Sequence, residues 1–167
     1  MKILKRKQII VALDFDSIEE ANSVVKLLDP ETYRLKIGKQ LFTAEGPQII
    51  ENFTKKGFEI FLDLKLHDIP NTVFKAMKNL LNHKVWMINI HLLGGEEMIQ
   101  AAREARESIK SEALLIGVSV LTSLNERNII NMGFGMQIPE LVKTLSMTAK
   151  QNKVDGVVCS AKEVSVI

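Results

Sequence analysis

The stretch Phe61-Leu-Asp-Leu-Lys-Leu-His-Asp-Ile-Pro-Asn-Thr72 places charged residues inside an apolar run. In a β-strand the side chains alternate between two faces, so Asp63 and Lys65 would leave the strand on one side and the leucines on the other. Asp68 follows where the run ends, in a strand-to-helix turn before Pro70, where functional groups are commonly displayed. A charge in a buried strand is costly unless it is paired, solvated or used. The stretch therefore predicts either a structural ion pair at a strand end or a functional cluster.

Composition and charge narrow the class of protein. The 167 residues are 46% hydrophobic and 25% charged, so a single domain over residues 1–167 is expected. The net charge is +2, and the one notable run of basic residues lies within residues 2–7. This distribution does not predict a binding surface for nucleic acid or for an anionic membrane. The single cysteine, Cys159, is expected to be a small buried residue. Apolar stretches are too short for a secretory signal or a membrane span, so we expect a soluble, cytoplasmic protein.

A unit of strand, turn and capped helix repeats along the chain, which is typical of consecutive βαβ units and a parallel sheet. Apolar runs predict six strands, at residues 8–15, 33–38, 61–66, 85–93, 114–121 and 154–159. Helices are predicted at about residues 17–28, 46–57, 71–83, 95–105 and 138–150, with a further one barely begun at the end. Capping boxes are predicted at Ser17–Glu20, Ser123–Glu126 and Ser160–Glu163.

Two features favour part of a (β/α)8 barrel over a doubly wound open sheet. No Gly-x-Gly-x-x-Gly follows the first strand, so the dinucleotide-binding open sheet lacks its phosphate loop. Polar residues also stand at or near the C-terminal ends of several strands, which a closed barrel brings around one site. These residues are Asp14, Lys36, Asp63, Lys65, Asp68, His91 and Thr122. The predicted fold class is α/β, a (β/α)8 TIM barrel of which about six units are present, because a complete barrel usually needs about 250 residues.

Several segments resemble the bacterial type of orotidine 5′-phosphate decarboxylase. They are Val11–Asp14, Leu35–Lys39, Phe61–Thr72, Val85–His91, Val120–Ser123 and Asp155–Ser160. The similarity runs from about Ile9 to Glu163. The Asp-x-Lys-x-x-Asp core is shared with related sugar-phosphate enzymes, whereas the full run from Asp63 to Thr72 is specific to the decarboxylase.

The resemblance implies a homodimeric carboxy-lyase that converts orotidine 5′-monophosphate to uridine 5′-monophosphate without metal or organic cofactor. By position, Lys65 matches the proton donor, and Asp63 flanks the reacting carbon with it. The other matched residues are Asp14 and Lys36 for the ribose, Thr122 for the pyrimidine, Ile69 for the substrate, and Asp68 and Thr72 for the neighbouring subunit's site. Physical chemistry agrees, because an ammonium near a developing carbanion stabilises its charge and then protonates it. A carboxylate beside that ammonium keeps it charged and repels the substrate carboxylate.

Two alternatives remain at this stage. A metal-assisted sugar-phosphate decarboxylase or aldolase shares the core motif, but Lys36 stands where those families use an acidic residue to help hold magnesium. His67 and His91 lack a third ligand at metal spacing and are expected to be hydrogen-bonded histidines. The second alternative is an inactive or partner-requiring fragment, because the resembled family continues into two strands that hold the substrate phosphate, and the tail after Glu163 departs from it. On that ground we expect negligible activity from this chain alone.

Overall fold

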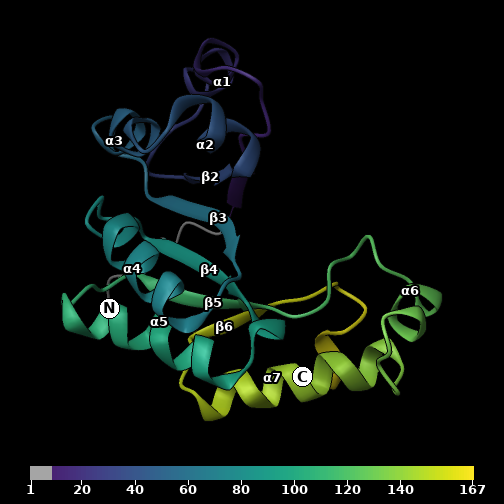
Figure 1. Cartoon of the computed structure of the whole chain (residues 1–167). Helices are drawn as coiled ribbons and strands as arrows, with labels where there is room; N and C mark the ends of the chain where they lie inside the picture. Colours follow the sequence, from purple (N-terminus) through teal and green to yellow (C-terminus); the bar gives the residue numbers. More distant parts are fainter. Residues whose placement is uncertain (1–8) are drawn as a thin grey trace, which may run out of the picture. The chain divides into compact units, whose positions relative to one another are not determined.

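The computed structural model describes residues 9–167, which divide into two compact units (Figure 1). One unit comprises the described residues up to Leu64 together with Asn79–Ile88, and the other comprises Lys65–Lys78 and Asn89–Ile167. A single domain over residues 1–167 stays a prediction. The basic residues among 2–7, and Gln8 at the predicted start of the first strand, lie outside the described residues.

The first unit contains three parallel strands with helices between them. Its elements are β1 (Ile9–Ala12), α1 (Ile18–Val25), β2 (Tyr33–Gly38), α2 (Lys39–Glu45), α3 (Gln48–Thr54) and the greater part of β3 (Ile60–Leu66). β2 pairs with β1 from Ile9 opposite Tyr33 onward, and with β3 up to Gly38 opposite Asp63. Fully buried apolar residues from β2, α2 and α3 form its core, namely Leu35, Ile37, Leu41, Ile49, Ile50 and Phe53.

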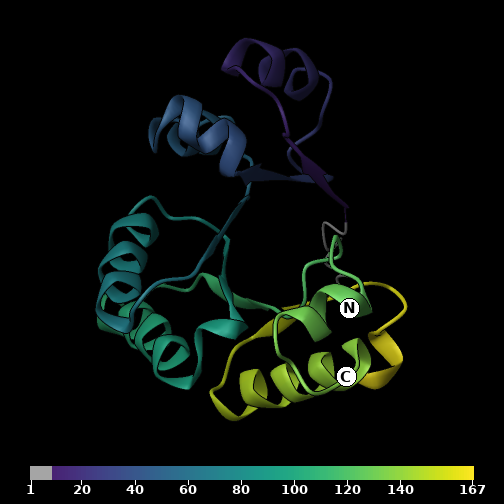
Figure 2. The same cartoon turned by 45° about the vertical axis from the view of Figure 1, so that its right-hand side comes forward.

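The second unit continues the alternation. Its elements are the end of β3, most of α4 (Pro70–Leu81) and of β4 (Met87–His91), a 3-10 turn (Leu92–Gly94), α5 (Glu96–Ser108), β5 (Leu114–Val118), α6 (Glu126–Asn131), α7 (Ile138–Gln151), β6 (Gly156–Val158) and a second 3-10 turn (Val164–Val166). β5 and β6 are parallel, with Ile116 opposite Gly156. Figure 2 shows the same succession of strand and helix from a second direction.

The strands follow one another in the sheet in chain order, from β1 to β6. Parallel strands joined by helices and ordered in this way are successive units of a (β/α)8 barrel, so the predicted fold class is confirmed. Among the helices within residues 9–167, none is long and apolar enough to cross a membrane.

Helix starts were predicted with mixed success. The Ser17 side chain accepts a hydrogen bond from the Glu20 amide at 3.3 Å, so this half of the predicted box is confirmed. The Glu20 carboxylate accepts from the Asp16 amide at 3.4 Å rather than from that of Ser17, so the other half is wrong. The box at Ser123–Glu126 is wrong, because α6 is capped two residues later, where Asn125 and Asn128 exchange side-chain-to-backbone hydrogen bonds of 3.0 Å. At Ser160–Glu163 the Glu163 carboxylate accepts from the Ser160 amide at 2.8 Å, and a 3-10 turn follows rather than an α-helix.

Other predictions missed an element or misjudged burial. α2 was not predicted, since its N-cap is Gly38, which offers no capping side chain. The fourth strand is shorter than predicted, because it ends at His91 and the next residues form the 3-10 turn. Cys159 is half-buried, so the expectation of a buried cysteine is wrong.

Several helices end in the same type of turn. At Gly57, Lys110, Gly133 and Lys153 the backbone φ is positive, and each of these amides donates to the carbonyl three residues earlier. The next amide in each case donates to the carbonyl five residues earlier, which completes a Schellman motif. Glycine is favoured at this position because it has no Cβ, so two of these four turns carry a lysine where glycine would be unstrained.

Candidate active site

Three predicted residues meet in the first unit around the ammonium of Lys36. The Lys36 Nζ lies 3.1 Å from Asp14 Oδ1 and 3.3 Å from Asp63 Oδ2. The three residues come from β2, from β3 and from the segment that follows β1, which are neighbours in the sheet. The Asp63 side chain is 12% exposed and that of Asp14 is 60% exposed, so the cluster reaches from the interior to solvent. One cation between two carboxylates makes the burial of Asp63 tolerable.

The local sequence explains why Lys36 points to this cluster. Leu35 and Ile37 are fully buried, and strand alternation sends the lysine between them to the opposite face. Gly38 lies close beside the charged groups. A Cβ at Gly38 would lie 3.2 Å from Asp14 Oδ1 and 3.5 Å from Lys36 Nζ, so the glycine leaves room for the ion pair. Gly38 lies in the segment Leu35–Lys39, whose sequence predicted no role for the glycine.

Lys65 lies in the second unit and has an unusual backbone. Its φ is +51°, in the left-handed region that lysine rarely adopts. Its amide donates a hydrogen bond of 2.7 Å to Oδ1 of Asn89 on β4. Asn89 is only 1% exposed. Sequence reasoning missed Asn89, although an amide between the isoleucines of Met87-Ile-Asn-Ile-His91 was a visible signal that something buried there needs a hydrogen bond.

The two histidines pack against each other. The rings of His67 and His91 are stacked with centroids 5.1 Å apart and planes 23° apart. His91 Nδ1 also accepts from the Leu93 amide at 3.3 Å and so caps the 3-10 turn after β4. Over residues 9–167 no group of three histidine, cysteine or acidic side chains is arranged to hold a metal ion. The prediction of hydrogen-bonded histidines is thus confirmed for His91.

The other residues of the motif lie on the surface at the start of α4. Asp68 and Thr72 are exposed, and Ile69 is 66% exposed. Asp68 Oδ1 accepts from the Ile69 amide at 2.7 Å, which fixes the turn into the helix. An exposed isoleucine between exposed polar residues is suited to contact another molecule.

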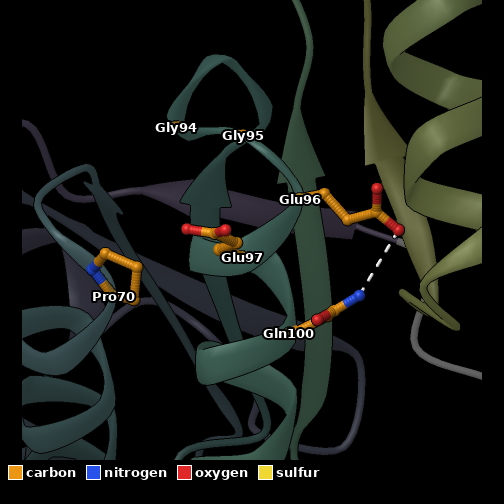
Figure 3. A pocket seen from close by; sticks show the side chains of 6 residues that line it. All are labelled: Pro70, Gly94, Gly95, Glu96, Glu97 and Gln100. Atoms are coloured by element: carbon orange, nitrogen blue, oxygen red, sulfur yellow. Dashed lines mark hydrogen bonds between the residues drawn. The ribbon is translucent and has the colours of Figure 1, made fainter.

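Two of the hollows in the second unit are large enough for a small molecule and adjoin the matched motifs. A cavity of about 660 Å³ contains Thr122. It is lined mostly by apolar groups of the β5–α6 connection, the start of α7 and the C-terminal segment. An open hollow of about 620 Å³ is lined by Pro70, Gly94, Gly95, Glu96, Glu97 and Gln100 (Figure 3). Figure 3 also shows the 3.3 Å hydrogen bond from Gln100 to Glu96. Only the first of these two hollows contains a predicted site residue.

Cys159 lies next to residues that line the Thr122 cavity. Burial raises the pKa of the Cys159 thiol above its usual value, and the nearby Glu163 carboxylate raises it further. The thiol is therefore protonated at neutral pH and is a poor nucleophile.

Comparison with known proteins agrees with this fold and these motifs. Residues 7–167 match the family model described as orotidine 5′-phosphate decarboxylase / HUMPS family. The orotidine 5′-phosphate decarboxylase of Saccharophagus degradans is 52% identical over 157 residues, which cover 94% of this chain and 66% of the relative. That of Aliivibrio fischeri is 45% identical over 165 residues, which cover 98% of this chain and 70% of the relative.

A solved structure gives the same result. The crystal structure of orotidine 5′-phosphate decarboxylase from Lactobacillus acidophilus matches with a TM-score of 0.87 and 36% identity, over 93% of this chain and 72% of that chain. The chain thus spans about two thirds of the length of the curated relatives it matches.

Proposed function

The chain belongs to the orotidine 5′-phosphate decarboxylase / HUMPS family, and on that premise we propose that it carries the decarboxylation site for orotidine 5′-monophosphate. The observation that carries the proposal is the ion-paired cluster of Asp14, Lys36 and Asp63, formed by residues that match the family's motif. Lys65 follows Asp63 two positions later on the same strand.

Lys65 is the proposed proton donor. The bond between C6 of the pyrimidine and the carboxylate carbon breaks, and its electron pair stays on C6 as carbon dioxide leaves. The resulting carbanion takes a proton from Lys65 Nζ, and the product is uridine 5′-monophosphate. The Lys65 ammonium stabilises the developing charge, because a fixed cation close to a forming anion lowers the barrier. Asp63 repels the substrate carboxylate, which disfavours bound substrate relative to the transition state.

Asp14 and Lys36 are proposed to bind the ribose hydroxyls. An ammonium has three N–H donors. Two carboxylates lie within hydrogen-bond distance of Lys36, so one donor direction is left for a hydroxyl. The Asp14 side chain is 60% exposed and keeps acceptor oxygens toward solvent. A donor and an acceptor side by side suit a vicinal diol.

Thr122 is proposed to contact the pyrimidine, and the cavity of about 660 Å³ that it lines is the supporting observation. Asp68, Ile69 and Thr72 are proposed to act at the neighbouring subunit's site in a homodimer. Their exposure at the start of α4 supports this role.

The test is a decarboxylation assay on two forms of the protein, following the loss of orotidine 5′-monophosphate. One is the 167-residue chain, and the other is the same chain joined to the part of the S. degradans relative that lies beyond the matched region, here called the completed chain. We expect turnover by the completed chain and negligible turnover by the chain alone, because binding energy from the substrate phosphate supports catalysis at the remote carbon. A completed chain that folds but does not decarboxylate orotidine 5′-monophosphate would refute the proposal.

The metal-dependent alternative is tested in the same assay. Lys36 places a cation between the two carboxylates, where a divalent ion would meet charge repulsion. Activity of the completed chain is expected to survive dialysis against a chelator. Loss of activity with chelator and its return with magnesium would favour the metal-dependent sugar-phosphate enzymes instead.

A further inference from the structure

Lys65 differs from the other lysines with a positive φ. Within residues 9–167 the non-glycine residues of this kind are Lys65, Lys84, Lys110 and Lys153. The last three follow helices, and each donates its amide to the carbonyl three residues earlier, as expected for a helix end. Lys65 lies within β3, where a left-handed residue interrupts the regular alternation of side chains. Its conformation therefore needs a support other than a helix end.

Asn89 supplies that support. The Lys65 amide donates to Asn89 Oδ1 at 2.7 Å, a short hydrogen bond for an N–H donor. Asn89 is 1% exposed and stands between Ile88 and Ile90, which are fully buried. A buried amide among apolar neighbours is costly unless it is hydrogen-bonded, and the Lys65 amide provides one of its hydrogen bonds.

The next residue on the same face of β4 acts on the same segment. His91 follows Asn89 by two positions, and its ring stacks on His67, which follows Lys65 by two positions. Two alternate side chains of β4 thus contact Lys65, at the end of β3, and His67, one residue beyond this strand. Both contacts join β4 to the stretch that leads from Lys65 to the start of α4.

We propose that Asn89 is a positioning residue for Lys65. By accepting the Lys65 amide proton it holds the backbone in the left-handed conformation, and this conformation sets the direction in which the Lys65 side chain leaves the strand. The ammonium is then placed by the backbone. The part of the proposal that concerns catalysis rests on the proposed function, in which Lys65 is the proton donor. The part that concerns backbone geometry does not.

The first experiment measures amide hydrogen exchange in the 167-residue chain. In the wild type the Lys65 amide is expected to exchange at least tenfold more slowly than an unstructured lysine amide, and exchange at the unstructured rate would overturn the inference. Asn89→Leu removes the acceptor at similar volume and is expected to release the Lys65 amide selectively. Asn89→Asp keeps an acceptor oxygen and is expected to retain protection.

A matched control is Asn152→Leu. Asn152 is the other buried asparagine, with 6% exposure, and it bonds to Gln100, Glu96 and Thr148 rather than to Lys65. The same chemical change at this position should leave exchange at Lys65 unaltered. Equal release of Lys65 in both asparagine-to-leucine variants would mean that Asn89 acts only on general stability, which overturns the inference.

The second experiment measures kinetics in the completed chain. Asn89→Leu is expected to lower kcat on the order of 10-fold to 100-fold with little change in KM, because a small misplacement of a reacting group costs about that much. Asn89→Asp should recover most of kcat, and Asn152→Leu should leave both constants near those of the wild type. An unchanged kcat in Asn89→Leu, with Lys65→Ala inactive, would overturn the positioning role and leave the proposed function intact. An active Lys65→Ala variant would instead refute the proposed function. The hydrogen-exchange data would still test whether Asn89 holds the backbone at Lys65.

Discussion

Lys36 and Lys65 are two lysines of neighbouring strands that are held in different ways. Lys36 is held by charge, with its Nζ within 3.3 Å of two carboxylates. Lys65 is held through its main chain, whose amide donates to the neutral side chain of Asn89. The neighbouring carboxylates thus act on Lys36 at the end of its side chain, whereas Asn89 acts on Lys65 through the backbone that carries the side chain. Changes to the carboxylates should therefore affect Lys36 directly, and changes to Asn89 should affect Lys65 through its backbone.

The largest effect is expected from Lys65→Ala in the completed chain. Loss of a positioned proton donor costs on the order of 10²–10⁴ in rate, so kcat should fall by that factor. The hydrogen bond to Asn89 reaches the main chain and survives the substitution, so the amide of residue 65 should still exchange slowly. Steady-state kinetics and amide hydrogen exchange on the same preparation test both statements. Exchange of that amide at the unstructured rate in the variant would contradict the main-chain contact.

The next effect is on stability, from Lys36→Met. This change keeps the length of the side chain but removes the cation beside Asp63, whose side chain is 12% exposed. The free energy of unfolding should fall by about 2 kcal/mol, because a buried carboxylate loses one of its partners. The control is Asp14→Asn at the 60% exposed end of the cluster, where a loss below about 1 kcal/mol is expected. Equal losses in the two variants would mean that burial of Asp63 does not set the cost.

A smaller effect, of opposite sign, is expected at the helix ends. Lys110→Gly and Lys153→Gly should each raise the free energy of unfolding by about 0.5–1 kcal/mol, because glycine adopts a positive φ without strain. Thermal unfolding of the single variants and of the double variant measures this, and the two gains should add, since the turns end different helices. A loss of stability in either variant would show that the lysine side chain contributes more than its backbone strain costs.

The smallest effect is expected on the reactivity of the half-buried Cys159 when the charge of Glu163 is removed. Burial is the main cause of the raised pKa of Cys159, and Glu163 adds to it. Glu163→Gln should therefore lower the pKa only slightly and increase the alkylation rate of Cys159 near neutral pH by a small factor, since the thiolate is the reactive form. Alkylation followed by mass spectrometry over a range of pH measures the shift. A slower reaction in the variant would contradict the sign.

The sequence predicted the order of strands and helices because apolar runs and capping residues are local signals. It also predicted that Lys36 and Asp63 belong together, since polar residues at the ends of neighbouring parallel strands must converge. It could not reveal α2, whose first residues carry no cap, or the choice of Asn125 over Ser123 as the cap of α6. The left-handed backbone at Lys65 was beyond reach as well, because lysine has no intrinsic preference for it and the cause lies on another strand, at Asn89.

The chain order of the strands has a consequence for synthesis on the ribosome. Each strand pairs with the strand made just before it, as in the pairing of Ile9 with Tyr33 and of Ile116 with Gly156. Contacts between units close in sequence form quickly, and domains generally fold from the N-terminus during translation. In a series of stalled ribosome complexes of increasing length, we expect the nascent chain to gain protease resistance in steps, one strand and its following helix at a time. A single late step would mean that the first strands and helices become resistant only when the later ones have been made.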